Sequence, residues 1–249
     1  MDEDAYKNIA VSAFSITHVE YARGDPVGFL AAGLSLAPVF LIVALVAAAI
    51  ARRDPHCAAA LLGQVLNTAW NIALKRVLRQ PRPPFLHQFR PAVVGFSPHG
   101  MPSNHSQFVF FFAAYWCSYL LRSNNNRPAP RTGAATTPRP GHLCHSVVRP
   151  VAVVVIPLCA ALVSAGRVYL TYHTPAQVVV GALVGVMTGL CWYAVTWKFI
   201  APVVFPRIAA SYIGRGLGIV DATGCGSRQD VVLWEYENLC SDDDSEKSR

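Results

Sequence analysis

Three short clusters of basic and histidine residues carry groups that could hold a phosphate and attack it. Arginine and lysine bind phosphate oxygens, and histidine can act as a nucleophile or exchange protons. The clusters are Lys75 with Arg82-Pro83 after six residues, Pro102-Ser103-Asn104-His105, and Arg167 with His173 after five residues. Together they predict one site for a phosphate ligand.

The residue types suggest a division of roles within this site. Lys75, Arg82 and Arg167 are expected to bind the phosphate oxygens. His173 is expected to attack phosphorus as a nucleophile, and His105 to protonate the departing oxygen as a general acid.

The second cluster opens a predicted helix, whose N-terminus offers free N–H groups and a partial positive charge to an anion. Ser103 is interpreted either as the cap of this helix or as a hydroxyl donor to phosphate, and the two roles are compatible. Asn104 is counted with the phosphate-binding residues.

Apolar segments long enough to cross a membrane must position these clusters. Of the 249 residues, 53% are hydrophobic and 14% are charged, whereas soluble domains carry about 25% charge. The composition predicts a polytopic, all-α transmembrane bundle with about five spans. The expected spans are residues 29–50, 57–78, 105–121, 151–170 and 176–200. Residues 122–150, with His142 and His145, are expected to form a polar loop.

Counting the spans brings all three clusters to the same face of the membrane. Lys75 and His105 lie between the second and third spans, and Arg167 and His173 lie between the fourth and fifth, two crossings later. Seven arginines belong to the opposite side, namely Arg52, Arg53, Arg122, Arg127, Arg131, Arg139 and Arg149. Because positive charge gathers in cytosolic loops, we expect the site on the non-cytosolic side.

Two spans carry a pattern along one helical face. In the second span, polar residues recur at steps of three and four, which turns them toward the bundle interior. They are Gln64, Asn67, Thr68, Asn71 and Lys75. In the fifth span a strip of small residues predicts close packing by another helix. It consists of Gly181, Gly185 and Gly189.

No carboxylate accompanies the cations of the central region. Between Asp54 and Asp221 the chain has no Asp or Glu but fourteen Lys and Arg. Because carboxylates hold the metals of two-metal phosphatases, we expect a reaction without metal or cofactor. A zinc site made by His87, His99 and His105 is the alternative. The seven cysteines show neither metal-ligand spacing nor a disulfide framework.

The arrangement resembles the type 2 phosphatidic acid phosphatase superfamily, which also includes glucose-6-phosphatase and the vanadium haloperoxidases. The pattern of that superfamily is Lys, six residues, Arg-Pro; then Pro-Ser-Gly-His; then Ser-Arg, five residues, His, three residues, Asp. This chain differs at three positions, with Asn104 for Gly, Gly166 for Ser and Gln177 for Asp. Gln177 can still orient His173 by accepting its ring N–H, without adding negative charge.

Within the superfamily, the chain is similar to the enzymes that hydrolyse dolichyl diphosphate. The likeness covers about residues 16–236 and includes segments 34–40, 100–108 and 205–210. It implies hydrolysis to dolichyl phosphate and phosphate through a phosphohistidine. It further implies that this occurs at the luminal face of the endoplasmic reticulum, where it recycles the lipid carrier for protein N-glycosylation.

The expected spans, together with the resemblance, divide the chain into three parts. These are a luminal N-terminal segment (1–28), a transmembrane phosphatase domain (29–205) and a cytosolic or interfacial C-terminal segment with an acidic tail (206–249). The implied partners are dolichyl diphosphate and membrane lipids, without nucleic acid, and the oligomeric state is open. The alternatives are a phosphatase for another lipid phosphate or for glucose 6-phosphate, and an inactive binder of phosphate lipids.

Overall fold

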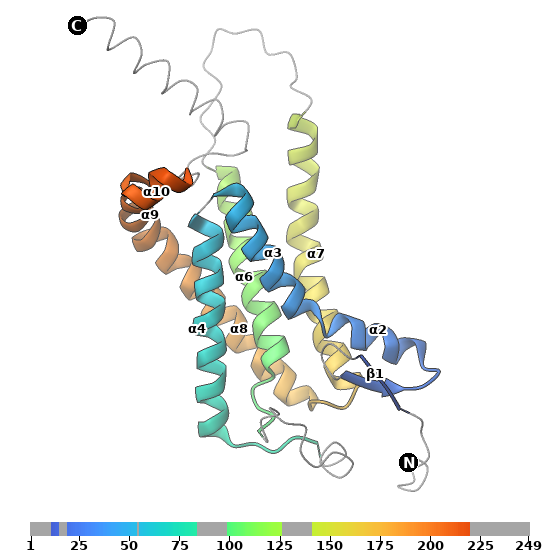
Figure 1. Cartoon of the computed structure of the whole chain (residues 1–249). Helices are drawn as coiled ribbons and strands as arrows, with labels where there is room; N and C mark the ends of the chain where they lie inside the picture. Colours follow the sequence, from blue (N-terminus) through green and yellow to red (C-terminus); the bar gives the residue numbers. More distant parts are fainter. Residues whose placement is uncertain (1–10, 15–18, 54, 84–98, 126–140, 220–249) are drawn as a thin grey trace, which may run out of the picture.

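The structure of the chain, a computed structural model, describes residues 11–14, 19–53, 55–83, 99–125 and 141–219. Long helices form a bundle, and a short β-hairpin lies beside one end of it (Figure 1), which confirms the predicted helical transmembrane fold. The elements in chain order are β1 (Val11–Phe14), β2 (Val19–Ala22), α2 (Pro26–Leu34), α3 (Ala37–Arg52), α4 (Pro55–Leu78), α6 (Asn104–Asn125), α7 (Gly141–Tyr169), α8 (Pro175–Val195), a π-helical segment (Thr196–Ile200), α9 (Ala201–Ala210) and α10 (Tyr212–Leu217).

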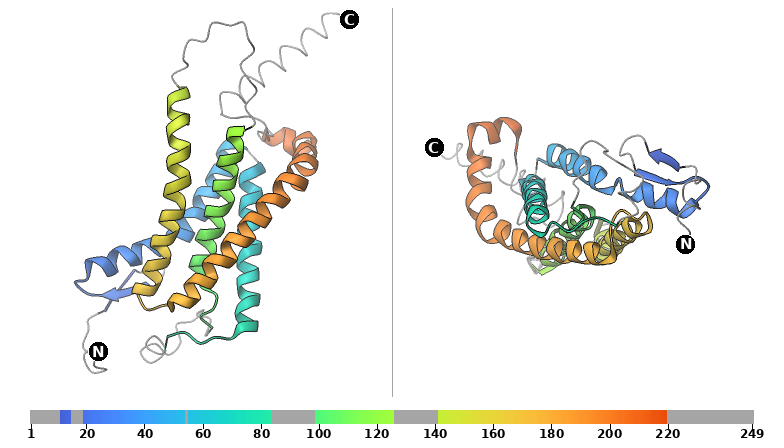
Figure 2. Two further views of the ribbon diagram at one scale, coloured as in Figure 1. Left: turned by 180° about the vertical axis from the view of Figure 1, so that it is seen from behind. Right: turned by 90° about the horizontal axis from the view of Figure 1, so that it is seen from below.

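Helix α6 lies at the centre of the bundle. It packs most extensively against α8 and also contacts α7, α4 and α3. Helices α4 and α7 run in one direction and α6 and α8 in the other, as Figures 1 and 2 show. The ends of α4 and α7 and the starts of α6 and α8 therefore lie at one end of the bundle, as the span count predicts.

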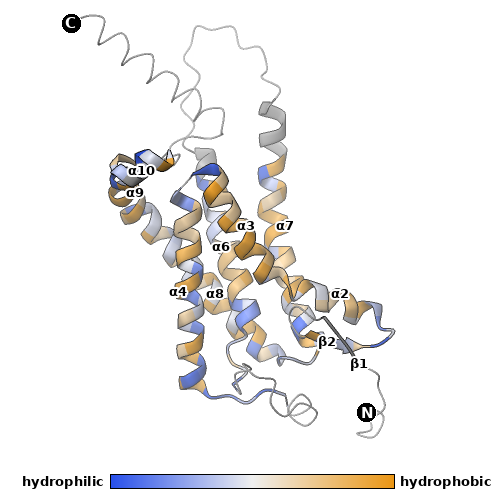
Figure 3. Cartoon of the chain, viewed as in Figure 1, coloured by the Kyte–Doolittle hydropathy of each residue, from blue (hydrophilic) through white to orange (hydrophobic). Residues whose placement is uncertain are grey.

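The outer surface of the bundle suits a lipid environment. Four helical stretches are long and apolar enough to cross a membrane, namely Pro26–Arg52, Pro55–Leu78, Val148–Tyr169 and Pro175–Ala210. Large apolar side chains such as Trp70, Val154 and Met187 are more than half exposed, and hydrophobic residues extend along the outer helices in Figure 3. Helix α6 is less apolar because other helices, rather than lipid, surround it.

The first predicted span, residues 29–50, consists of two helices instead of one. Helix α2 ends at Leu34 and α3 begins at Ala37, and the two run in different directions in Figure 1. Proline has no N–H, and in a continuous helix the ring of Pro38 would clash with the carbonyl of Leu34. At the bend, the buried hydroxyl of Ser35 donates to the carbonyl of Ala31 at 3.0 Å. The break therefore places a polar residue inside the bundle.

The glycine strip of α8 is the surface that packs against α6. A Cβ added to Gly181 would lie 2.7 Å from the carbonyl oxygen of Ser103, and one added to Gly189 would lie 2.7 Å from that of Phe111. At Gly185 it would overlap the carbonyl oxygen of Gln107. Because these neighbours are backbone atoms of a helix, they cannot move aside singly. The strip sets the separation of the two helices.

The boundaries predicted for the loop at residues 122–150 are wrong at both ends. Helix α6 continues to Asn125 and α7 begins at Gly141, and residues 126–140 lie outside the described part. Helix α7 continues through two prolines, which membrane helices tolerate because neighbouring groups replace the lost hydrogen bonds. Two residues that we expected in the loop are therefore helical, namely His142 and His145.

The hairpin of β1 and β2 was not expected from the sequence. Its antiparallel register pairs Val11 with Ala22 and Phe14 with Val19. Each strand has only four residues, too few for an alternating pattern to stand out. The hairpin lies at the same end of the bundle as the predicted site (Figure 1).

Candidate active site

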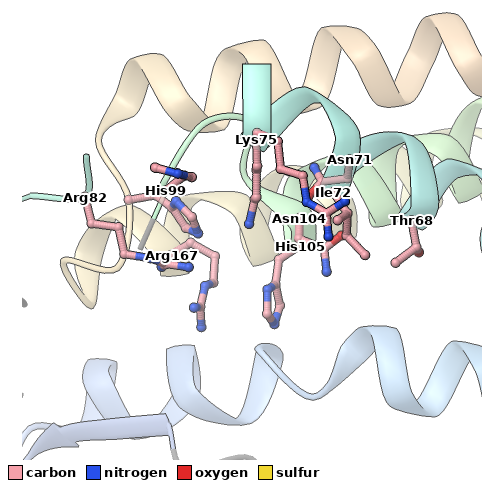
Figure 4. Close-up of a pocket in the computed structure, with 11 residues that line it drawn as sticks. Thr68, Asn71, Ile72, Lys75, Arg82, His99, Asn104, His105 and Arg167 are labelled. Atoms are coloured by element: carbon pink, nitrogen blue, oxygen red, sulfur yellow. The ribbon is translucent and has the colours of Figure 1, made fainter. Parts of the chain in front are cut away.

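The predicted site residues converge on one cavity at this end of the bundle. The cavity has a volume of about 390 Å³. Its lining includes six residues that the sequence analysis proposed, namely Lys75, Arg82, Asn104, His105, Arg167 and His173. In Figure 4 the side chains of Arg167 and His105 extend toward the blue ribbon of the α2–α3 region. Segments nearly a hundred residues apart thus build a single site.

The cavity is rich in buried positive charge. Only 8% of Lys75, 8% of Arg82 and 2% of Arg167 is exposed. Burial lowers the pKa of Arg82 to about 10. Among the described residues that line the cavity, none is Asp or Glu. Buried cations gathered in one cavity suit an anion that enters from outside.

Arg167 is held by uncharged groups. Its Nη1 donates to the hydroxyl of Ser35 at 3.1 Å, and its guanidinium carbon lies 4.1 Å from the centre of the Tyr172 ring. Its buried Nε has no hydrogen-bond partner among the described residues. These contacts fix the side chain and leave an N–H for a ligand. Ser35 was not singled out from the sequence, because its contact depends on the break between α2 and α3.

Tyr172 connects both arginines and was also missed. Besides its contact with Arg167, its carbonyl oxygen accepts a hydrogen bond from Nη1 of Arg82 at 3.2 Å. Its hydroxyl accepts from the backbone N–H of Glu20 in β2 at 3.0 Å. The residue is almost fully buried. Its position directly before His173 was the only sequence signal for this role.

The hydrogen bonds of Gln177 determine which nitrogen of His173 carries the proton. Nε2 of Gln177 faces the carbonyl of Pro81 at 2.8 Å, and a carbonyl can only accept, so this atom is the amide nitrogen. The amide oxygen then faces Nδ1 of His173 at 3.2 Å. Nδ1 must therefore carry the hydrogen, and Nε2 of His173 keeps the lone pair that a nucleophile needs.

The environment of His173 keeps its ring neutral. Burial, followed by the positive charges of Arg82 and Arg167, lowers the pKa of His173 to about 3. The hydrogen bond to Gln177 opposes this shift only in part. At neutral pH the imidazole is therefore unprotonated and able to attack.

Gln177 also joins the segments that surround the site. Its backbone carbonyl accepts from the N–H of Ser103 at 3.0 Å, and it forms a capping box with Thr174 at the start of α8. A Cβ on Gly100 would lie 2.5 Å from its amide oxygen. Glycine at position 100 thus makes room for the side chain that orients His173.

The second cluster divides between the cavity and the helix interface. Asn104 and His105 line the cavity, and the ring of His105 faces the backbone of Ser35. Ser103 has no exposed surface and is absent from the lining. Its hydroxyl accepts from that of Ser106 at 3.3 Å. In this conformation Ser103 joins α6 to α8, and its contact with phosphate stays a prediction.

The polar stripe of α4 forms a network of hydrogen bonds beside the cavity. Asn71 donates to Gln107 at 2.7 Å and to the carbonyl of Pro102 at 3.3 Å. Gln107 donates to the side-chain oxygen of Asn67 at 2.8 Å, which also accepts from Thr188 of α8 at 2.9 Å. The network therefore supports the turn that precedes His105.

Gly166 has a packing role that explains its departure from the superfamily pattern. A Cβ at this position would lie 3.3 Å from the Cβ of Ala31. The glycine therefore lets α7 approach α2 closely, next to the bend that carries Ser35. The side chain of a serine at this position would be in tight contact with Ala31 of α2.

The geometry suits phosphoryl transfer. Buried cations can hold a tetrahedral anion, His173 offers an unprotonated nitrogen, and His105 lies in the same cavity, where it could exchange a proton. Among the described residues, no three His, Cys, Asp or Glu side chains form a metal-binding group. His87, part of the alternative zinc site, lies outside them.

Comparison with known proteins gives several matches. A model of the PAP2 superfamily matches residues 55–201. Dolichyldiphosphatase 1 of Rhinolophus ferrumequinum is 38% identical over 224 residues, which cover 89% of this chain and 85% of that protein. Dolichyldiphosphatase 1 of Homo sapiens is 38% identical over 197 residues, or 79% and 76% of the two chains. Lipid phosphate phosphatase gamma of Arabidopsis thaliana is 32% identical and covers 96% of both. No solved structure matches the chain.

A charged partner for His173 tests the account of its protonation. In Gln177→Glu, the new carboxylate should raise the pKa of His173 because it favours the imidazolium form. The neutral ring is the form that diethyl pyrocarbonate modifies. Modification of His173, measured by mass spectrometry as a function of pH, should therefore fall off at a higher pH in the variant. In Gln177→Leu, the control, the pKa should stay low. Identical profiles for Gln177→Glu and the native chain would contradict the account.

Proposed function

Because this chain belongs to the PAP2 superfamily, we propose that it hydrolyses dolichyl diphosphate to dolichyl phosphate and phosphate. One observation carries the proposal, namely that three buried cations and two histidines line a single cavity, with no Asp or Glu among its described lining residues. The names of the curated relatives, and the large share of both chains that each match covers, support a polyprenyl diphosphate lipid as the substrate. The apolar outer surface supports a substrate that approaches from a membrane.

In the first step, Nε2 of His173 attacks the terminal phosphorus. The new N–P bond forms as the bond from phosphorus to the bridging oxygen breaks, and the electron pair leaves with that oxygen. Dolichyl phosphate departs, with His105 donating a proton to it where needed. A phosphate monoester is a better leaving group than an alkoxide, so the demand on His105 is modest.

In the second step, water attacks the phosphohistidine. His105, now unprotonated, accepts a proton from the water as its oxygen bonds to phosphorus. The N–P bond breaks, its electron pair returns to His173, and inorganic phosphate is released. The ring of His173 regains its starting tautomer because Gln177 holds Nδ1–H throughout.

The cations replace the metal ions that many phosphatases use. Lys75, Arg82 and Arg167 can neutralise the oxygens of the transferred group as charge develops on them. Metal ions in such sites are held mainly by carboxylates, and residues 55–220 contain none. We therefore extend the proposal to a reaction that needs no metal.

The proposal includes a luminal site in the endoplasmic reticulum. The site and the β-hairpin lie at one end of the bundle, and α10 lies at the other (Figure 1). The other end also carries Arg52 and Arg53 at the end of α3 and Arg122 near the end of α6. This distribution supports a cytosolic location for that end.

Substrate assays with purified protein test the proposed reaction. The native chain should release phosphate from dolichyl diphosphate, with or without EDTA, faster than from phosphatidic acid or glucose 6-phosphate. His173→Ala should lower the rate at least about a thousandfold, and Arg167→Ala about a hundredfold because one stabilising donor is lost. The exposed Arg207 of α9 provides a matched control, Arg207→Ala, which should leave the rate unchanged.

Three results of these assays would contradict the proposal. Loss of activity in EDTA would reject the metal-free mechanism. Full activity of His173→Ala would reject the assignment of His173 as the nucleophile. Preference for phosphatidic acid would favour a general lipid phosphate phosphatase, the activity in the name of the Arabidopsis thaliana relative.

Glycosylation of terminal tags tests the orientation. A short segment with an N-glycosylation acceptor, fused before Met1, should be glycosylated in microsomes because that end is expected in the lumen. The same segment fused after Arg249 should stay unmodified. Sensitivity of each fusion to an endoglycosidase gives the result, and modification of the C-terminal fusion alone would reverse the orientation.

A further inference from the structure

A second cavity lies between the break in the first span and the outer side of α6. It has a volume of about 380 Å³, within the range of pockets that bind small organic ligands. Residues of α2 and α3 form one wall, α7 forms the other, and α6 forms the floor. Every described side chain in its lining is aliphatic, aromatic, a cysteine or a glycine. Because such side chains form few or weak hydrogen bonds, the groove suits a hydrocarbon.

The groove begins one helical turn from the active-site residues. Val109 in its floor follows His105 by four residues on α6, and Val163 in its wall precedes Arg167 by four residues on α7. Residues four apart lie on the same helical face, about 6 Å apart along the axis. In the opposite wall, Ala37 comes two residues after Ser35. The two cavities share no described lining residue, but one helical turn of α6 and of α7 separates them.

The groove is open to the side of the bundle that faces lipid. Phe40 is 65% exposed and Val155 is 44% exposed, and both line it. Helix α2 packs on α7 near the site, whereas α3 turns away from α7 after the break (Figure 1). A chain attached to a phosphate in the cavity can therefore enter the groove from the bilayer without passing through water.

From this proximity and from the apolar lining we infer that the groove seats the first isoprene units of the polyprenyl chain of the substrate. The inference rests on the proposed function and adds a binding site for the lipid part. Because the chain comes from lipid, the hydrophobic effect contributes little to its binding. Contact with the groove instead fixes the direction in which the chain leaves the diphosphate, and so holds the bridging oxygen in line with His173.

Gly33 allows the groove to be filled with little disturbance of the fold. It lines the groove, and a Cβ added to it would meet no atom within 4 Å. Gly33→Phe should therefore occupy the groove while leaving the phosphate cavity intact. The matched control is Gly216→Phe, because Gly216 in α10 is also open and lies at the other end of the bundle.

The test compares two diphosphates that differ in their chains. In detergent micelles, Gly33→Phe should lower kcat/KM for dolichyl diphosphate on the order of tenfold, because the chain can no longer direct the scissile bond. With isopentenyl diphosphate, which is too short to fill the groove, kcat/KM should stay within about twofold of the native value. Gly216→Phe should behave like the native chain with both substrates.

A second measurement does not depend on turnover. Cys159 lines the groove, whereas Cys191 does not, and both are exposed. Dolichyl diphosphate should protect Cys159 of His173→Ala from an apolar maleimide but leave Cys191 reactive. Mass spectrometry of the modified peptides gives the two rates. Protection of neither cysteine, or equal protection by a phospholipid, would overturn the inference.

These outcomes separate the groove from the reaction itself. If Gly33→Phe lowers the rate equally with both diphosphates, or with neither, the groove does not seat the chain, although the proposed reaction stands. If the native chain hydrolyses neither diphosphate, the proposed function fails. Protection of Cys159 would then still identify a site for the isoprenoid chain.

Discussion

Positive charge gathered inside the bundle is the constraint on which this structure depends. Removing a charge from water costs on the order of several kcal/mol, and here the charges of three side chains share one cavity. Uncharged groups hold the two arginines, namely the hydroxyl of Ser35 and the ring and carbonyl of Tyr172. The same positive charges help to keep His173 neutral. A phosphate, as proposed, would add negative charge among these cations.

The helix contacts serve this arrangement. The glycine strip of α8 brings its backbone against α6, which places Gln177 and His173 beside the start of α6. The amide network between Asn67, Asn71 and Gln107 holds the turn before His105. Two residues of the third cluster differ from the superfamily pattern, and both fit this packing. Gly166 allows α2 to approach α7 closely, and Gln177 orients His173. On the two proposals above, the site has one part for phosphate and, in the apolar groove, one for hydrocarbon.

Much of the site could be predicted from sequence because its signals are local. Spacing along a helix identified the stripe that ends at Lys75, and the span count brought His105 and His173 to one end. Ser35 and Tyr172 could not be found in this way, since their roles depend on a helix break and on contacts between distant segments. The extent of the 122–150 loop was misjudged because its prolines were read as loop residues. The short hairpin carried too little periodicity to detect.

The central claim is that a neutral His173, held among buried cations, attacks the terminal phosphate. Rapid quenching of the purified protein with dolichyl diphosphate labelled with ³²P in its terminal phosphate tests this claim most directly. The account predicts a label that forms and decays within one turnover, is stable to alkali and labile to acid, and maps to the peptide that contains His173. Label on another residue, or turnover by His173→Ala at the native rate, would contradict it.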